Sequence, residues 1–297
     1  MNKMFLNKDE ILLICMKLDL SALIKFSSCN KKIYEKSQGI WQYKLKEFSE
    51  SSLFVESDKE KYILLSQLTI LKRKLNFYDS LYELYNTENI ASCSTVICII
   101  PKEILCLKNL KNLYLHNNAI KYIPKELGGL ISLRKLYLGN NQISEIPIEI
   151  CNLTNLHILS LYSNNIEILP KELSTMKNLT HLHLSDNRIK DISSLINMTK
   201  LIQLDLDNND ISVIPKKFCE NENLSFLHLI NNSIEMLPKE LFNLTNLAKL
   251  FLSGNKIKEI PPGFSKLTNL KMLSLQSNPL IAIPKEITEN CFLQLYK

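Results

Sequence analysis

Histidine and aspartate side chains recur at short spacing in one part of this sequence. His181 and His183 are followed by Asp205 and Asp207, and then by His228. If the three segments are adjacent strands of a parallel sheet, their side chains lie on backbones about 4.8 Å apart. Imidazoles and carboxylates at that spacing could bind a transition metal or make binding depend on pH. They could also form a polar contact patch for a partner, which is the interpretation we favour, so we predict no metal site and no cofactor.

No other pattern in the chain is typical of catalysis. The sequence contains no glycine-rich phosphate loop, no nucleophile motif and no paired-carboxylate cleft, so we predict that the protein is not an enzyme. Its eight cysteines form no Cys-x-x-Cys pair. Scattered thiols of this kind are typical of buried side chains in a reducing cytosol.

Charge and hydropathy argue against two further classes of partner. The formal net charge is +6, but only three basic residues are arginines and the lysines often stand beside glutamates. This is unlike the clustered arginines of nucleic-acid readers. No uninterrupted apolar run reaches the roughly 18 residues of a membrane span, and the N-terminus turns acidic before any long apolar stretch, unlike a secretory signal. We therefore expect a cytoplasmic protein that binds neither nucleic acid nor membrane.

The elements that position these side chains are indicated by eight evenly spaced asparagines. Six of the seven intervals between them are 23 residues long and one is 22. The eight are Asn118, Asn141, Asn164, Asn187, Asn209, Asn232, Asn255 and Asn278. A fixed period of this length predicts a solenoid, in which each unit stacks on a copy of itself.

Residues 107–129 illustrate one unit, which reads L-x-x-L-x-x-L-x-L-x-x-N-x-I-x-x-I-P-x-E-L-x-x. Leu113 and Leu115 alternate with polar residues, so a short strand should turn both leucines inward. Asn118 follows the strand, where its amide can bond backbone groups of its own turn and of the neighbouring turn. Pro124 cannot donate a ladder hydrogen bond, so it should end the extended segment and start the outer one.

This pattern resembles the leucine-rich-repeat family, and in particular the intracellular I-P-x-E type of Ras-group and Scribble-like scaffolds. The resemblance covers about residues 107–290 in eight copies. It implies an α/β solenoid, a leucine-rich-repeat horseshoe with a parallel concave β-sheet. We place the repeats at residues 87–297, with a degenerate first repeat at 87–106 and a partial C-terminal one that begins at Leu293. The copy around residues 187–195 lacks the proline and one residue, so its outer segment should be shorter.

Strand side chains that do not point inward should form the concave face, which is where a protein partner would bind. Four of the five histidines fall on this face, together with several aromatic residues that the fold does not require there. Aromatic anchors are enriched at protein interfaces. The predicted binding residues are Tyr114, Tyr137, Tyr162, His181, His183, Asp205, Asp207, Phe226, His228 and Phe251.

The N-terminal residues follow a different pattern. Residues 1–48 suit three short helices, which cannot bury much core alone. The order Leu6-Asn7-Lys8-Asp9, then Leu18-Asp19-Leu20-Ser21-Ala22-Leu23, a basic pair and Trp41, resembles an F-box. It departs from that family's pattern at Asn7 and Asp9, which replace proline and glutamate, and at Ile33, which replaces the first tryptophan. The alternative is a small helical cap. Residues 49–86 read as a helical connector.

Resemblance to the F-box family implies docking on the Skp-type adaptor of a cullin-RING ubiquitin ligase. On that interpretation the adaptor-binding residues are Leu6, Ile14, Leu18, Leu20, Leu23 and Trp41. We predict a protein, monomeric by itself, that holds a protein substrate for the ligase. The alternative is a non-catalytic scaffold or signalling regulator of the Ras-group type. Either protein could belong to a pathogen or virus and act in a host cytoplasm.

Overall fold

The structure is a computed structural model that describes residues 58–75, 81–93, 97–289 and 293–296. Between Thr87 and Glu88 the chain divides into two units, each described by itself. The F-box-like module predicted for residues 1–48, with all six of its adaptor-binding residues, lies outside the described residues. It therefore stays a prediction.

The described part of the first unit consists of two helices, α5 (Asp58–Lys74) and α6 (Leu81–Asn86). They pack against each other, and they lie where the sequence predicts a helical connector. Leu65, Leu68 and Leu71 of α5 are fully buried, as expected for apolar residues that recur every three positions on one helix face. Among the described residues, no helix has the length and apolar character needed to cross a bilayer.

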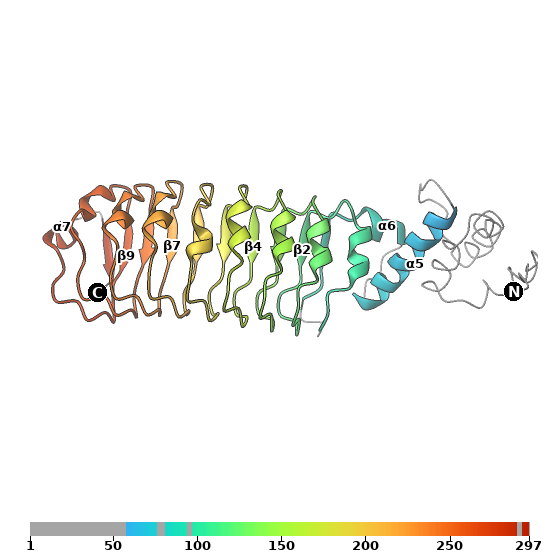
Figure 1. Cartoon of the computed structure of the whole chain (residues 1–297), viewed down its shortest axis with the longest axis horizontal. Coiled ribbons are helices and arrows are strands. Elements are labelled where there is room, and N and C mark those ends of the chain that lie inside the picture. The colour runs from blue at the N-terminus through green and yellow to red at the C-terminus, as the bar shows by residue number, and fades with distance from the viewer. Residues whose placement is uncertain (1–57, 76–80, 94–96, 290–292, 297) are drawn as a thin grey trace, which may run out of the picture. The chain divides into compact units, whose positions relative to one another are not determined.

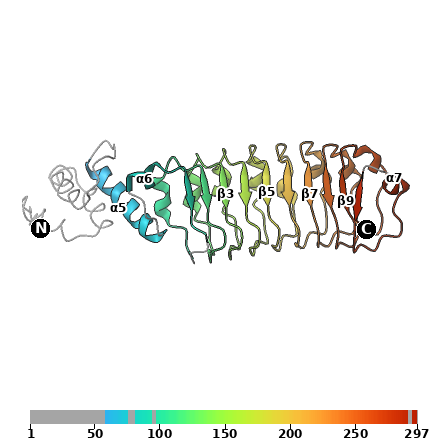
Figure 2. The same ribbon diagram turned by 180° about the vertical axis from the view of Figure 1, so that it is seen from behind.

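The second unit contains a single ten-stranded sheet in which every strand is parallel to its neighbours and follows them in chain order. The 3-10 turns form a second layer over the sheet: they lie in front of it in Figure 1 and behind it in Figure 2. The strands are β1 (Asn89–Ala91), β2 (Asn112–Tyr114), β3 (Lys135–Tyr137), β4 (Ile158–Ser160), β5 (His181–His183), β6 (Gln203–Asp205), β7 (Phe226–His228), β8 (Lys249–Phe251), β9 (Met272–Ser274) and β10 (Gln294–Tyr296). The predicted leucine-rich-repeat solenoid with a parallel sheet is confirmed.

The central leucine of each repeat builds the core between the two layers. Leu113 of β2 stands beside Leu136 of β3 in register, and both are fully buried. The second strand-end leucine, Leu115, is equally buried. A strand turns alternate side chains to opposite faces, so the residues between and before these leucines point away from the core.

Proline starts most of the outer turns. Pro124 has a φ of −66°, the angle that its ring imposes, and its carbonyl accepts the N–H of Leu127 at 2.9 Å. The outer turns are η1 (Lys102–Cys106), η2 (Lys125–Gly129), η3 (Ile148–Asn152), η4 (Lys171–Thr175), η5 (Ser193–Leu195), η6 (Lys216–Glu220), η7 (Lys239–Asn243) and η8 (Phe264–Lys266), followed by the short helix α7 (Lys285–Thr288). The repeat without proline has η5, which is three residues long where most others have five, so the shorter outer segment is confirmed.

The recurring asparagines link each repeat to the one before it. Asn141 donates from Nδ2 to the carbonyls of Leu138 (3.0 Å) and of Leu115 in the preceding repeat (3.0 Å). Its Oδ1 accepts the N–H of Ile120 at 3.0 Å. All eight asparagines donate in the same way to a carbonyl of the preceding repeat and accept one backbone N–H from it. Each amide thus satisfies backbone groups that stacking removes from water, as the sequence predicts.

Both terminal repeats extend the sheet. β1 pairs with β2 so that Asn89 stands beside Asn112, and this register puts the buried Ser92 at the position of Leu115. At the other end β10 pairs with β9, directly after the buried Leu293. The predicted degenerate first repeat and the partial last one both contribute strands.

Candidate functional site

The outward side chains of strands β2–β9, together with the residue two positions beyond the end of each strand, form a surface that we call the strand face. All ten residues predicted to bind a partner lie on it, and each is partly buried. Eight of them come from strands that are only three residues long and are fixed in register by their neighbours, and Tyr162 and Asp207 follow their strands. The sheet therefore holds their backbones rigidly, and the side chains contact one another across strands.

At one end of the strand face, two tyrosine rings stack. Tyr114 and Tyr137 stand side by side in register, with ring centroids 5.0 Å apart and an interplanar angle of 14°. Burial, and to a lesser degree the neighbouring Tyr114, raises the pKa of Tyr137. The phenol of Tyr137 is consequently a neutral donor and acceptor at neutral pH.

Next to this pair the strand face is hollowed by a depression of about 330 Å³. It forms where small residues separate large ones: Ser160 lies between Tyr137 and His183 in the same row. The ring of Tyr162 lies against the backbone of Gly139, where an added Cβ would come within 2.1 Å of a ring carbon. The lining residues are His116, Tyr137, Ser160, Tyr162, His183, Ser185 and Asp205.

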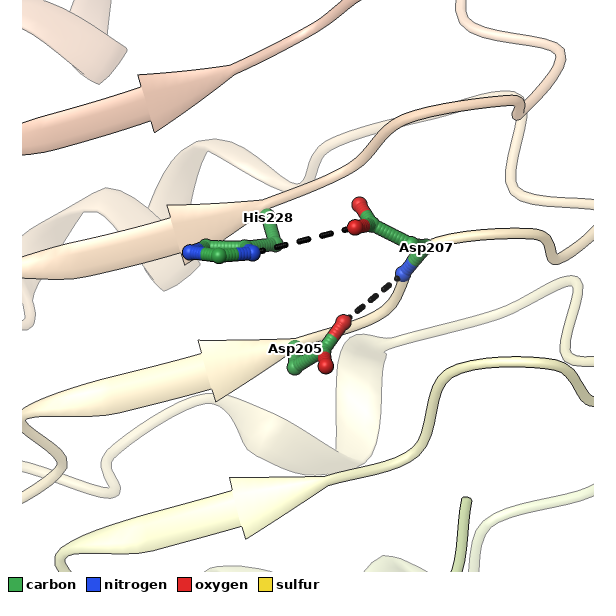
Figure 3. A group of neighbouring side chains, drawn as sticks. All are labelled: Asp205, Asp207 and His228. Carbon is green, nitrogen blue, oxygen red and sulfur yellow. Dashed lines mark hydrogen bonds and ion pairs between the residues drawn. The ribbon is translucent and has the colours of Figure 1, made fainter. Parts of the chain in front are cut away.

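Asp205, which lines the depression, lies close to Asp207 and His228 (Figure 3). Asp205 Oδ1 accepts the N–H of Asp207 at 3.2 Å, and Asp207 Oδ1 accepts the N–H of Ile230 at 2.6 Å. Nδ1 of His228 lies 3.7 Å from Asp207 Oδ2, an ion-pair distance when the imidazole is protonated. One potential ligand atom from each of Asp205, Asp207 and His228 lies within 4.8 Å of the others. Of the five His and Asp residues that the sequence suggests as ligands, only these three come together in this way; His181 and His183 do not join them.

Burial shifts the pKa of Asp205, His183 and His181. It raises the pKa of Asp205, although the N–H of Asp207 donates to that carboxylate and opposes the shift. Burial also lowers the pKa of His183, against the attraction of Asp205, and it lowers the pKa of His181. His183 therefore stays neutral to a lower pH than an ordinary histidine does.

The far end of the strand face is again aromatic. His228 and Phe251 are neighbours in register and meet edge to face, with ring centroids 4.7 Å apart. Lys249 places its Nζ 5.4 Å from the ring centroid of Phe226, within range of a cation–π contact. The sequence prediction did not include Lys249 among the binding residues, because a lysine beside a polar strand position is usually just a solvated side chain.

A set of exposed apolar side chains that the sequence analysis does not single out lies off the strand face. Five large apolar side chains each stand two residues before the proline that starts an outer turn, and between 64% and 79% of each is exposed. They are Ile99, Tyr122, Ile168, Val213 and Met236. Their common distance from the proline was a visible signal. By contrast, the isoleucines at Ile120 and Ile123, close by in the same segment, are buried.

Comparison with known proteins agrees with the repeat. The family described as leucine-rich repeat region matches residues 123–216, and the family described as leucine rich repeat matches residues 100–143 and 222–280. A comparison with curated proteins finds no match.

Three solved structures illustrate the similarity. A leucine-rich-repeat protein of Leptospira interrogans is 35% identical over 66% of this chain and 50% of its own, with a TM-score of 0.63. The internalin inlF of Listeria monocytogenes is 27% identical over 66% of this chain and 56% of its own, with a TM-score of 0.61. The plant peptide hormone receptor RGFR1, solved in complex with RGF2, is 30% identical over 66% of this chain and 37% of its own, with a TM-score of 0.59. The match thus spans roughly half or less of each of these proteins. The structure has ten parallel strands in repeat register, and the two leucine-rich-repeat families together match residues 100–216 and 222–280, so this chain is a leucine-rich-repeat protein.

Proposed function

We propose that the chain is a non-catalytic protein-binding module whose strand face holds a protein partner. The observation that carries this proposal is the row of aromatic and charged side chains across adjacent strands, from the stacked Tyr114 and Tyr137 to the His228–Phe251 pair. None of these side chains belongs to the buried leucine core. Rigid aromatic groups that are already held by neighbours lose little entropy on binding, so they suit the centre of an interface.

The similar structures give this proposal a precedent. RGFR1, which is 30% identical to this chain over the matched part, is described as a plant peptide hormone receptor in complex with RGF2. What this chain binds has to be inferred from its own side chains.

The finer part of the proposal concerns residues 1–48. Their resemblance to an F-box supports a role as the substrate receptor of a cullin-RING ubiquitin ligase in the cytoplasm, with Leu18 and Leu20 among the residues that dock on a Skp-type adaptor. The support is the order and spacing of these residues in the sequence. The competing proposal is a scaffold or signalling regulator of the Ras-group type, in which residues 1–48 do not bind a Skp-type adaptor. Both proposals share the same strand face.

A capture experiment with matched tyrosines tests the shared part. The tagged chain is used to isolate proteins from cells, and Tyr137→Ala is compared with Tyr122→Ala, which removes an exposed tyrosine that lies off the strand face. We expect Tyr137→Ala to lose a bound protein that Tyr122→Ala retains. Equal capture by wild type and both variants would place any binding elsewhere and contradict the proposal.

Co-precipitation of a Skp-type adaptor tests the finer part. Wild type and Tyr137→Ala should recover the adaptor equally, because the strand face is not its docking site. The double substitution Leu18→Asp/Leu20→Asp should lose the adaptor. If wild type recovers none, or the double variant recovers as much as wild type, the ligase role is wrong and the scaffold role is favoured.

A further inference from the structure

The depression on the strand face has room for a large side chain. Its volume of about 330 Å³ is at the lower end of the range for ligand pockets, about 300–1,000 Å³. It is open to solvent, and its lining includes Ser160, which is only 2% exposed, and the rings of Tyr137, Tyr162 and His183. A partner that lies across the sheet could therefore insert one residue without any movement of the backbone.

The walls of the depression favour a flat or elongated group. Tyr137 stands on one side, held by its stack on Tyr114, and Tyr162 is held against Gly139, where no side chain intervenes. Both rings line the depression. Such surfaces attract apolar chains and cations alike.

Charge decides between these two kinds of group. Asp205 is the one carboxylate among the lining residues. The N–H of Asp207 and the hydroxyl of Ser185 donate to it, so two of its roughly four lone-pair sites remain. Within the described residues, no lysine or arginine forms an ion pair with it. The other nearby carboxylate, Asp207, is instead engaged by Ile230 and His228.

We infer that the depression receives an arginine side chain of the protein partner, with the guanidinium on the Asp205 carboxylate and the aliphatic stem between the rings of Tyr137 and Tyr162. This inference rests on the proposed function and names the chemistry that the strand face selects. A guanidinium is planar, stacks on aromatic faces and pairs with a carboxylate through two parallel hydrogen bonds. A lysine ammonium is more strongly hydrated and lacks the flat face, so it fits this site less well.

The surroundings of Asp205 agree with a cationic guest. The pKa of Asp205 is raised by burial, because removing the charged carboxylate from water is unfavourable. A bound cation offsets that cost. Neutral His183, which stands beside Asp205 in register, adds no repulsion, because burial lowers its pKa.

Selection from a displayed random peptide library on the purified full chain tests the inference. Peptides selected on wild type should share an arginine. Replacing it by citrulline, which keeps the shape but removes the charge, should weaken binding by about tenfold or more, as expected for a lost charge-assisted hydrogen bond. Asp205→Asn should weaken binding similarly and remove the preference for arginine over citrulline. The control Asp210→Asn, the same change at an exposed carboxylate outside the depression, should leave both unchanged.

A second variant changes the shape of the depression and leaves its charge unchanged. Gly139→Ala forces the Tyr162 ring away from its place and should also weaken the arginine peptides, with the charge of Asp205 intact. If the selected peptides depend on Tyr137 but bind equally with citrulline, or bind Asp205→Asn as well as wild type, the arginine inference is wrong and the proposed function stands. If no selected peptide depends on Tyr137 or Phe251, both are wrong.

Discussion

The core and the strand face are built from alternate residues of the same strands, yet they follow opposite rules. The central strand residue is leucine in every repeat from Leu113 to Leu273, and none of these leucines is more than 1% exposed. The residue directly after it is tyrosine in β2 and β3, serine in β4, histidine in β5 and aspartate in β6. Stacking requires each repeat to fit its neighbour, so the inward position is fixed. The outward position carries no such requirement and is free to serve recognition.

The largest expected effect comes from breaking the asparagine links. Asn209→Ala removes the donor to the carbonyls of Leu184 and Leu206 and the acceptor of the Ile189 N–H. Several backbone groups then stay buried without a partner, at about 1–3 kcal/mol each, so we expect a loss of about 4 kcal/mol in unfolding free energy. Urea denaturation followed by circular dichroism measures it.

The matched control is Asn223→Ala, because this exposed asparagine makes one bond, to the Thr199 carbonyl, where water can replace it. We expect it to cost less than about 1 kcal/mol. Equal destabilisation by the two substitutions would mean that burial of the amide is not what makes Asn209 essential.

Adjacent residues of β6 sharpen the comparison between core and face. Leu204→Ala opens a cavity beside Leu182 and Leu227, its neighbours in register, and should cost about 3 kcal/mol. Gln203→Ala, one residue earlier and partly exposed, should change stability by less than about 0.5 kcal/mol. Thermal and urea unfolding of both variants measure the difference, and a comparable cost at Gln203 would show that the strand face also supports the fold.

Substitution of Asp205 should have a smaller effect on stability, and at neutral pH it should not destabilise the protein. Because burial raises its folded pKa, the folded state holds this proton more tightly than the unfolded state. Its stabilising contribution is therefore fully present below the ordinary pKa of 3.8 and is lost as pH rises through the raised folded pKa. Asp205→Asn should remove this dependence and be at least as stable as wild type at pH 7.

Urea midpoints measured between pH 3 and 7 test this, with Asp210→Asn as the control that keeps the wild-type dependence. A clear loss of stability at pH 7 in Asp205→Asn would show instead that the carboxylate is stabilised by its neighbours. Such a result would weaken the charge argument for an arginine guest.

The spacing of residues in the sequence predicts the backbone of this molecule but not the positions of its side chains. The 23-residue period and the positions of Leu113, Leu115 and Asn118 predict the strands, their register and the hydrogen bonds of the asparagines, because these depend on backbone position alone. They also place the ten binding residues on one face. The depression depends on where side chains turn: the ring of Tyr162 occupies the space over Gly139, and no periodicity specifies a rotamer.

The same limit applies to the histidines. Spacing puts His183, Asp205 and His228 in one row, but the side chains that come together are Asp205, Asp207 and His228. Asp207 joins because the backbone N–H of Ile230 holds its carboxylate, an interaction between repeats that the sequence pattern does not reveal.

The smallest expected effect is that of zinc on this group. Zinc bonds of about 2.0–2.2 Å in a tetrahedral site require ligand atoms about 3.4 Å apart, whereas those of Asp205, Asp207 and His228 are spread over as much as 4.8 Å. The strands that carry them are fixed in register, and one oxygen of Asp207 is already engaged by Ile230. We therefore expect zinc to leave the thermal midpoint of wild type unchanged, and Asp207→Asn to respond no differently. A stabilisation by zinc that Asp207→Asn abolishes would turn this contact patch into a metal site, because a ligand raises the midpoint only by binding the folded state.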